Sequence, residues 1–539
     1  MNYQHMRRLF FLTLLSLLFH LSAQSQPLQF QATRTHDNGS MGSILLAAPD
    51  QGSVLAGHSA LGNTGYLDLV KYDEFRNYVW SVSYQLTDTL LYVTDGCSYG
   101  DQGYLFAASV HSGNANTSEL LLIRTDTAGN MLWNRRYSIG LRCDLSSLLP
   151  VADGGFIAGG TVLTDSTARY EDMLVIRGNE DGNLLWSQSI GSSARESGNS
   201  MIRTSDDQYA IAGTTEDANG SSGAFLSKLD TSGNYYWFTR YATGIYDAAY
   251  SLVQADNGSY QLAGKGGPTG EDVLLLRTDV NGTPSFARIY QLSFGTYQLN
   301  ETALGMTGTP DGGFLIGGEV LRPGTLNPWL FLVKFSGNLL TEWFNSYAFS
   351  TSRDQRFGSM LQQADGGVLL GGSRRISAAY PWNALTIATD ASGISGCLET
   401  ALNEHDSTVT PIAINLSPVS NTTVPTAYYS QLTAVQPNWT TDSACYTFTN
   451  ISQTNTSLET LSFYPQPATQ QLSIREPGLL KFPCSYHIFD QVGRSSLQGT
   501  LDSIDSTLPL TSLTAGIYQV WLVGSDGTPA RASLIIQKP

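Results

Sequence analysis

The sequence predicts an all-β fold, a seven-bladed β-propeller followed by a small Ig-like β-sandwich, on three observations. An element close to Asp-Gly-Gly-aromatic-apolar-x-Ala-Gly occurs seven times, at intervals of 50 to 55 residues. An apolar strand, a turn of the Gly-Asn type and usually a Trp follow most copies about 20 residues later. After the first 25 residues, no segment keeps the 3.6-residue apolar period of a long helix.

Each repeat is expected to hold four short antiparallel strands, A to D, because Asp, Gly and Asn accept the positive φ angles of tight hairpins. Four strands in a repeat of this length are typical of one propeller blade. Paired glycines at the end of strand B are expected to allow close packing of the backbone. The seven copies of the first element begin at Asp50, Asp101, Asp153, Asp206, Asp256, Asp311 and Asp365.

The seventh repeat lacks its last strand, since the chain reaches Cys397 without the Trp-containing segment. Residues 28–33, which precede the first repeat, are similar to the D strands of other repeats. We therefore predict that residues 28–33 pair with residues 384–390 and close the ring. Closure would protect strand edges that otherwise promote aggregation.

Four parts of the chain are distinguished by composition. Residues 1–25 carry two arginines, an apolar core of about 13 residues and small residues before a cleavage point, as a signal peptide does. The propeller is predicted for residues 26–397. Residues 398–457 are rich in Thr, Ser, Asn and Pro and predict an irregular extension and linker. Residues 458–539 predict a separate domain of short alternating strands.

Charge and motifs exclude several functions. The net charge of −16 argues against nonspecific binding to nucleic acid or to anionic lipid. No segment after the leader approaches the 18 apolar residues of a membrane span. Histidines are scattered and no CxxC pair occurs, so neither a metal site nor a cofactor is expected.

Five cysteines are present. Cys397 and Cys445 bracket the non-repetitive extension, and we predict that they form a disulfide there. Cys97, Cys143 and Cys484 are expected to be reduced core residues.

The C-terminal domain resembles the type A sorting domain of type IX secretion cargo. The residues that carry this resemblance include Tyr464, Pro465, Pro467, Asp490, Gly493, Arg494, Gly516 and Tyr518. Gln466 departs from the Asn that this family usually has between the two prolines. The repeats are similar to those of secreted Bacteroidota propellers. The resemblance implies export through the type IX machinery, removal of the domain, and a protein that is secreted or held on the outer-membrane surface.

Variable connections on one face of the ring indicate where a ligand would bind. The B–C connections run about 7 to 11 residues and differ between repeats, whereas the A–B and C–D turns are short and repeated. Arginines there can grip carboxylate or sulfate, and aromatic rings can stack on sugars. Nearby acids such as Asp354 can instead neutralise these arginines. The candidate ligand-binding residues are Trp329, Arg353, Arg356, Arg374, Arg375, Tyr380 and Trp382.

The sequence favours a noncatalytic secreted or surface protein that binds a glycan or a protein. No nucleophile elbow, phosphate loop or metal-ligand cluster is visible, so no catalytic residue is assigned. One alternative is a propeller-type polysaccharide lyase or glycosidase. Another is a passive structural or matrix component. The nearly constant repeat spacing favours the two noncatalytic functions.

Overall fold

The structure is a computed structural model with two compact units, residues 27–447 and residues 448–539 grouped with 1–26. The residues it describes are 40–111, 117–164, 170–192, 194–217, 219–268, 272–294, 297–321, 328–347, 354–375, 382–395, 399–400, 403–416, 419–422, 426–428, 432–435, 459–460, 462–464, 468, 471–476, 481–489, 495–503, 507–511, 513, 516–523, 525 and 529–536.

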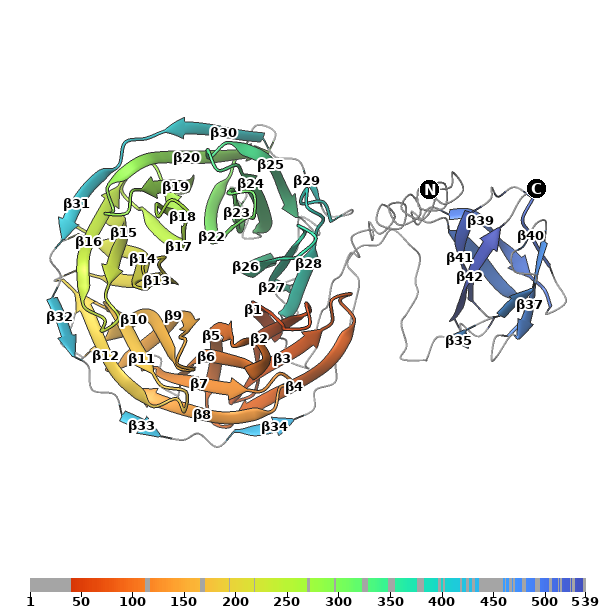
Figure 1. Ribbon diagram of the computed structural model, residues 1–539, viewed down its shortest axis with the longest axis horizontal. Coiled ribbons are helices and arrows are strands. Elements are labelled where there is room, and N and C mark those ends of the chain that lie inside the picture. Colours follow the sequence, from red (N-terminus) through yellow and green to blue (C-terminus); the bar gives the residue numbers. More distant parts are fainter. Residues whose placement is uncertain are drawn as a thin grey trace, which may run out of the picture. The chain divides into compact units, whose positions relative to one another are not determined.

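The larger unit is an all-β propeller of seven blades, as the repeats predict (Figure 1). Each blade is an antiparallel sheet whose strand A lies toward the centre of the ring. Blades 1 to 3 contain β1 Ser40–Ala47, β2 Ser53–Leu61, β3 Thr64–Tyr72, β4 Tyr78–Leu86; β5 Leu90–Ser98, β6 Tyr104–His111, β7 Glu119–Thr125, β8 Met131–Ser138; and β9 Arg142–Pro150, β10 Phe156–Leu163, β11 Asp172–Gly178, β12 Leu184–Gly191. A 3-10 turn, Gly100–Gln102, precedes β6.

Blades 4 to 6 repeat this four-stranded pattern, and blade 7 has three strands within the described residues. Their strands are β13 Glu196–Arg203, β14 Tyr209–Glu216, β15 Ser222–Leu229, β16 Tyr235–Ala242; β17 Ala248–Gln254, β18 Tyr260–Gly266, β19 Asp272–Thr278, β20 Pro284–Phe294 with β21 Tyr297–Gln298; β22 Asn300–Gly308, β23 Phe314–Leu321, β24 Trp329–Phe335, β25 Thr341–Tyr347; and β26 Asp354–Gln362, β27 Val368–Arg375, β28 Asn383–Ala388.

Glycine in strand B allows the bulged strand A to approach closely. In blade 3 the register between β9 and β10 shifts at Gly159/Gly160, where β9 carries one extra residue. A Cβ on Gly160 would lie 2.1 Å from the carbonyl oxygen of Asp144. The same position in blade 6, Gly318, would place a Cβ 2.0 Å from the Thr302 carbonyl. The paired glycines therefore allow close backbone packing, as predicted.

Neighbouring blades are joined by contacts between aromatic residues of strand D and a glycine in the C–D turn of the next blade. These contacts, here called the aromatic clamp, explain why Gly and Trp recur in the repeats. The ring of Trp133 in blade 2 lies against Gly182, in the C–D turn of blade 3, which has a φ of 83°. The Tyr137 hydroxyl of the same strand donates to the Gly182 carbonyl oxygen. In blade 6, Tyr347 donates to the Gly393 carbonyl oxygen at 2.7 Å. In blades 1 to 6, an aromatic residue of strand D thus contacts the C–D turn of the next blade.

We expect Gly182→Ala to destabilise the propeller by about 2 to 3 kcal/mol, because the new Cβ meets both a positive φ and the Trp133 ring 2.7 Å away. Gly220→Ala is the matched control. Gly220 has a φ of 81° but nothing lies within 4 Å of a Cβ there, so its cost should be about 1 kcal/mol. Urea unfolding of both variants measures the difference, and equal losses would contradict the clamp.

The closure of the ring falls outside the described residues, since residues 28–33 are not among them. The described part of blade 7 ends its sheet at β28, where the predicted closing strand would pair. The C–D turn of blade 1, which would face that strand, carries Arg76 at a φ of 66° instead of Gly. The closure by residues 28–33 remains a prediction.

The described part of the extension after blade 7 forms regular strands, contrary to the expectation of an irregular segment. Within residues 399–435, here called the belt, the described residues form six short strands along the perimeter of the ring (Figure 1). Each pairs antiparallel with one D strand, in the order of blades 6, 5, 4, 3, 2 and 1. They are β29 Glu399–Thr400, β30 Asn403–Thr408, β31 Ile412–Leu416, β32 Val419–Thr422, β33 Thr426–Tyr428 and β34 Thr433–Val435.

The C-terminal unit contains two sheets that share one hydrophobic core, with Leu472, Ile488, Val520 and Leu534 fully buried. Its assignment as Ig-like remains a prediction. Cys484 belongs to this core. The strands are β35 Glu459–Thr460, β36 Ser462–Tyr464, β37 Gln471–Glu476, β38 Cys484–Phe489, β39 Ser495–Leu501, β40 Thr507–Pro509, β41 Gly516–Val523 and β42 Pro529–Ile536.

The structure describes three of the five cysteines. Cys97, Cys143 and Cys484 are buried and free of disulfides, which confirms their assignment as core thiols. Burial raises the pKa of the Cys143 thiol to about 12, so it stays protonated. Cys397 and Cys445 lie outside the described residues, and their disulfide remains a prediction.

Candidate functional site

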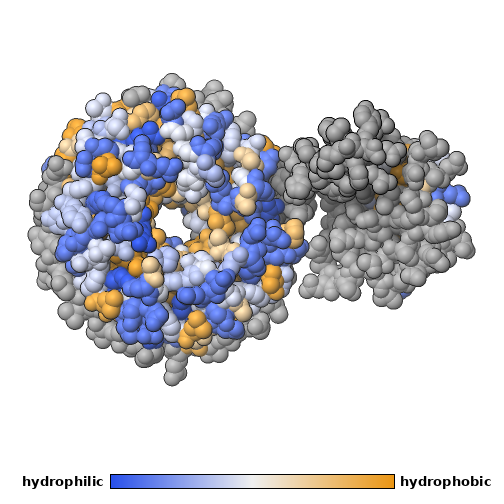
Figure 2. Space-filling model, viewed as in Figure 1, coloured by the Kyte–Doolittle hydropathy of each residue, from blue (hydrophilic) through white to orange (hydrophobic). Residues whose placement is uncertain are grey.

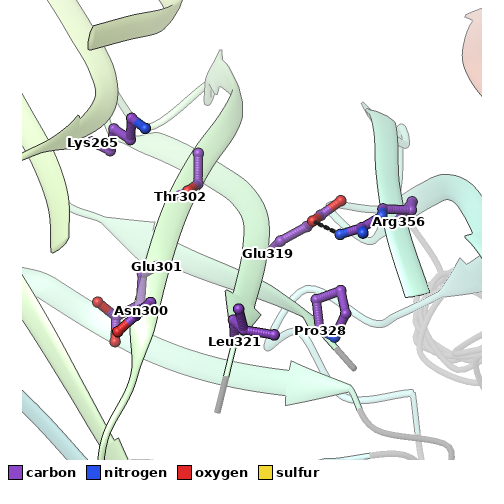
Figure 3. Close-up of a pocket in the computed structure, with 8 residues that line it drawn as sticks. All are labelled: Lys265, Asn300, Glu301, Thr302, Glu319, Leu321, Pro328 and Arg356. Atoms are coloured by element: carbon purple, nitrogen blue, oxygen red, sulfur yellow. Dashed lines mark hydrogen bonds and ion pairs between the residues drawn. The ribbon is translucent and has the colours of Figure 1, made fainter. Parts of the chain in front are cut away.

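A pocket of about 250 Å³ opens where blades 5, 6 and 7 meet, at the ends of B strands and the starts of A strands (Figure 3). This is the face of the B–C and D–A connections, here called the loop face, on which the sequence placed ligand binding. Charged and polar side chains dominate the lining, beside one proline and one leucine. The lining residues are Lys265, Asn300, Glu301, Thr302, Glu319, Leu321, Pro328 and Arg356.

Successive blades are joined by a repeated contact between strand B of one blade and strand A of the next. The residue that makes it directly follows the pair of small residues in strand B. The pocket lies where this contact is missing, between blades 5 and 6. Ser109 donates to Asp144 at 2.5 Å, and Thr161 and Ser197 hydroxyls lie 3.0 Å apart. Glu319 of blade 6 accepts from Arg356 at 2.9 Å and from the Phe357 N–H at 2.8 Å. These contacts have a structural role, since each links two sheets.

In blade 5 the residue that follows the small pair of strand B is Lys265, and it forms no such contact with the next blade. Among the Lys and Arg residues that the structure describes in the propeller, it alone has no hydrogen-bond, ion-pair or ring partner. Its side chain is half-buried, and its neighbour across the sheet junction is Thr302 (Figure 3). A half-buried ammonium with open donors is suited to an anionic oxygen of a ligand.

The two acids of the pocket are already engaged by the protein. Glu301 is 1% exposed and accepts the Leu292 N–H at 3.0 Å. Burial raises the pKa of Glu319, while Arg356 opposes that shift. Because Glu319 neutralises Arg356, Lys265 is the cation that a ligand can reach.

The structure brings together only part of the predicted patch. Arg356 lines the pocket, and Arg375 lies 4.9 Å over the Trp382 ring while its Nε donates to Asp354 at 2.9 Å. Arg353 and Tyr380 lie outside the described residues. Arg142 and Arg195, two further arginines of the loop face, both pair with Glu171. Nearby acids therefore pair with the described loop-face arginines Arg142, Arg195, Arg356 and Arg375, which was the alternative interpretation.

Two predicted ligand residues, Trp329 and Arg374, are buried, so their prediction as surface ligands was wrong. Trp329 is 6% exposed and packs in a core shared by blades 5 and 6. It begins β24, whose seven residues are all buried because strand C lies between B and D with neighbouring blades on both faces. Arg374 is 3% exposed within β27. Neither side chain is available on the surface.

Lys265, Thr302 and Glu319 were missed by reasoning from the sequence. An alignment of the repeats at the small pair that ends strand B would have shown Lys265 and Glu319. At the following position, four copies have Ser or Thr and one has His, whereas blades 5 and 6 have Lys265 and Glu319. A charged residue at a position that is otherwise small marks the departure from symmetry.

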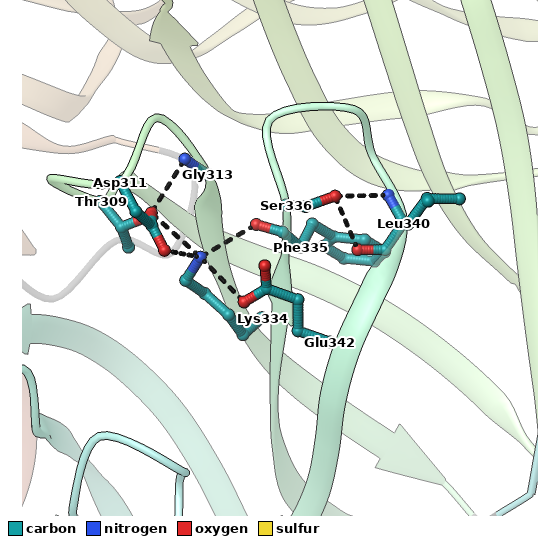
Figure 4. Close-up of polar contacts among 8 residues, drawn as sticks. All are labelled: Thr309, Asp311, Gly313, Lys334, Phe335, Ser336, Leu340 and Glu342. Atoms are coloured by element: carbon teal, nitrogen blue, oxygen red, sulfur yellow. Dashed lines mark hydrogen bonds and ion pairs between the residues drawn. The ribbon is translucent and has the colours of Figure 1, made fainter.

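The repeated Asp of the A–B turns has a structural role on the opposite face (Figure 4). Asp311 accepts from Lys334 at 2.8 Å and from the Gly313 N–H at 3.0 Å, and it accepts from the Thr309 hydroxyl. The Lys334 ammonium and these donors lower the pKa of Asp311. Equivalent pairs join strand C to the turn in blades 1, 3 and 4: Lys71–Asp50, Arg177–Asp153 and Lys228–Asp206.

We expect Asp311→Asn to lower the free energy of unfolding at pH 7 by about 0.5 to 1 kcal/mol, a modest loss because the carboxylate is 58% exposed and screened. A lowered folded pKa means that this stabilisation exists above the unfolded carboxyl pKa and is lost as pH falls. The difference should therefore shrink as pH falls below about 4. Asp365→Asn is the control, because Asp365 accepts the equivalent Gly367 N–H, but strand C of its blade has no Lys or Arg to pair with it. A pH-independent difference would contradict the role of the charge.

Among the described residues, no group of three or more His, Cys, Asp or Glu side chains could hold a metal ion. No described helix is long and apolar enough to cross a membrane. On the ring face seen in Figure 2, polar patches separate the apolar ones around an open centre.

Comparisons with known proteins give distant structural likenesses. No protein-family model and no curated protein matches the sequence. A protein of unknown function from Dyadobacter fermentans DSM 18053 is similar at 10% identity and a TM-score of 0.38, over 68% of this chain and 99% of that one. The S. cerevisiae core factor matches at 11% identity and a TM-score of 0.34, over 69% of this chain and 63% of that one. An extracellular domain from B. thetaiotaomicron matches at 10% identity and a TM-score of 0.18, over 94% and 99%.

Proposed function

We propose that this chain is a secreted, noncatalytic binding protein, and that the Lys265 pocket receives a carboxylate-bearing unit of a glycan. The observation that carries the proposal is the unpartnered ammonium of Lys265 in a pocket on the variable face of the ring. Hydrogen-bonding groups of Asn300 and Thr302 line the same pocket, and such groups fit sugar hydroxyls. Arg375 and Trp382 lie on blade 7, beside the strand that provides Arg356.

A glycosidase is the alternative that the pocket itself raises, because two carboxyl groups, Glu301 and Glu319, line it. Glu319 is paired with Arg356 and a backbone N–H, and a backbone N–H also binds Glu301. These bonds favour a structural role for both acids. Turnover of a bound oligosaccharide would establish the enzyme instead.

We expect Lys265→Ala to weaken binding of an acidic oligosaccharide at least tenfold, about 1.4 kcal/mol, because the carboxylate loses its cationic partner. A glycan array that contains uronic-acid oligosaccharides and their neutral counterparts identifies the probe. Calorimetry with the best acidic glycan then measures affinity for the wild type and the variants. Binding should also weaken as salt increases.

Lys265→Arg, which keeps the charge, should retain most of the affinity and is the matched control. Lys228→Ala removes a cation that is paired with Asp206 on the opposite face and should leave binding unchanged. Equal affinity of wild type and Lys265→Ala would reject this pocket. Failure of every glycan to bind wild type would favour a protein ligand or a passive structural role.

The export proposal concerns the C-terminal unit. We infer that it is a type A sorting domain read by the type IX machinery, and that a Bacteroidota cell exports the chain to its surface or medium. Tyr464 lies in β36, and Tyr518 of β41 is buried in the hydrophobic core of this unit. Gly516 begins β41. Pro465, Pro467, Asp490, Gly493 and Arg494 lie outside the described residues.

A further inference from the structure

The belt pairs with successive blades at intervals of seven residues, although its sequence shows no obvious repeat. Five of the six D strands that it covers place a Tyr at the same pairing position, and blade 3 places Ile190 there. The belt residues opposite these six positions are Glu399, Asp406, Ala413, Ser420, Ala427 and Ala434, each seven residues after the last. The belt therefore advances one blade for every seven residues.

This step has a geometric cause. An extended chain rises about 3.3 Å per residue, so seven residues reach about 23 Å. The belt makes this step five times without losing its register, which requires D-strand edges that are evenly spaced around the perimeter. A change of one residue would move every later strand out of phase and reverse the faces of its side chains.

Side chains of the belt also contact the blades, through an ion pair and through apolar packing. Asp406 forms an ion pair with Arg288 of blade 5 at 2.7 Å. Val409 packs on the core between blades 4 and 5, and its N–H donates to the Ala287 carbonyl oxygen at 3.1 Å. Leu432 packs on the core between blades 1 and 2. Pro411 lies in the link between β30 and β31, where no ladder bond is lost.

We propose that the six outer D-strand edges form one continuous binding surface for an extended segment with a seven-residue step. The occupant is the belt of the same chain, which thereby ties blades 1 to 6 together. The order of pairing supports an occupant in cis. The last described strand of blade 7 is β28, which ends at Ala388, and the belt strands that follow pair with blades 6, 5, 4, 3, 2 and 1 in that order. Main-chain pairing of this kind depends on register more than on side-chain identity.

Deletion of Thr410 in the full-length chain tests the register, since this residue lies in the link between β30 and β31. Hydrogen exchange should become at least tenfold faster at D-strand amides of β16, β12, β8 and β4 that face the belt. The amides of β20 and β25, paired with belt strands before the deletion, should keep their protection. Deletion of Ser443, after the last belt strand, should change none of them. Unchanged exchange in all six blades, or an equal loss in all six, would overturn the proposal.

A cross-link keeps the proposal testable if that deletion does not fold. Ser138 and Thr426 are directly opposed on β8 and β33, so Ser138→Cys with Thr426→Cys should form an intramolecular disulfide under oxidising conditions. Ser138→Cys with Tyr428→Cys is the register control, because Tyr428 opposes Arg136 and should not cross-link. A disulfide-linked dimer in the first variant would mean that a second copy supplies the belt. No cross-link, or equal cross-linking of both variants, would refute the register.

Discussion

Deleting residues 26–35 is expected to lower the free energy of unfolding by at least about 3 kcal/mol, because a closing strand and the aromatic ring of Phe30 would be lost. Blade 7 is where such a loss should matter most. It shows three strands in the described part of the chain, and the described belt strands pair only with blades 1 to 6. No other part of the described structure joins blade 7 to blade 1 by strand pairing.

An equally long deletion in the linker, residues 446–455, is the control and should leave the stability of the propeller unchanged. Urea unfolding followed by tryptophan fluorescence measures both variants against the full chain. A small and equal effect of the two deletions would show that residues 28–33 do not close the ring. A structure in which residues 28–33 pair with a segment other than 384–390 would exclude the predicted partner.

The blades could be predicted from the sequence because their strongest contacts use unusual residues at fixed positions. Gly182 has to be small beside the Trp133 ring and has to accept a positive φ, so both residues recur and reveal the period. For the Asp at each A–B turn, the sequence predicted the turn but not the side-chain partner. Its ion pair with strand C, as in Asp311–Lys334, joins residues 23 positions apart and was not predicted.

The belt and the pocket were harder to predict because their signals are weak. Strand addition at an edge uses backbone N–H and carbonyl groups, so Ala413 and Ser420 can occupy equivalent positions. The seven-residue spacing of Pro411, Pro418 and Pro425 was the one visible hint. The pocket depends on a junction of three blades, and only the fold shows that Lys265 lacks the partner that the equivalent Ser109 has.

Deleting residues 458–539 is expected to leave a folded propeller that accumulates in the periplasm and is absent from the cell surface and medium. The two units are compact by themselves, and the fourteen-residue C-terminal core is built from residues of that unit alone. The propeller should therefore unfold at the temperature of the full chain while losing its export signal. Fractionation of an expressing type IX-competent Bacteroidota strain, followed by immunoblotting with an antibody against the propeller, measures location.

Replacing the same residues by an established type IX sorting domain should restore export and is the positive control. A structural role of the C-terminal unit would instead reduce propeller stability on deletion, and export would not be rescued. Normal appearance of the truncated chain outside the cell would refute sorting by this unit. Peptides from residues 458–539 on the mature surface protein would count against removal of the domain, but not against its role in export. Location and processing are therefore separate readouts of the same strain.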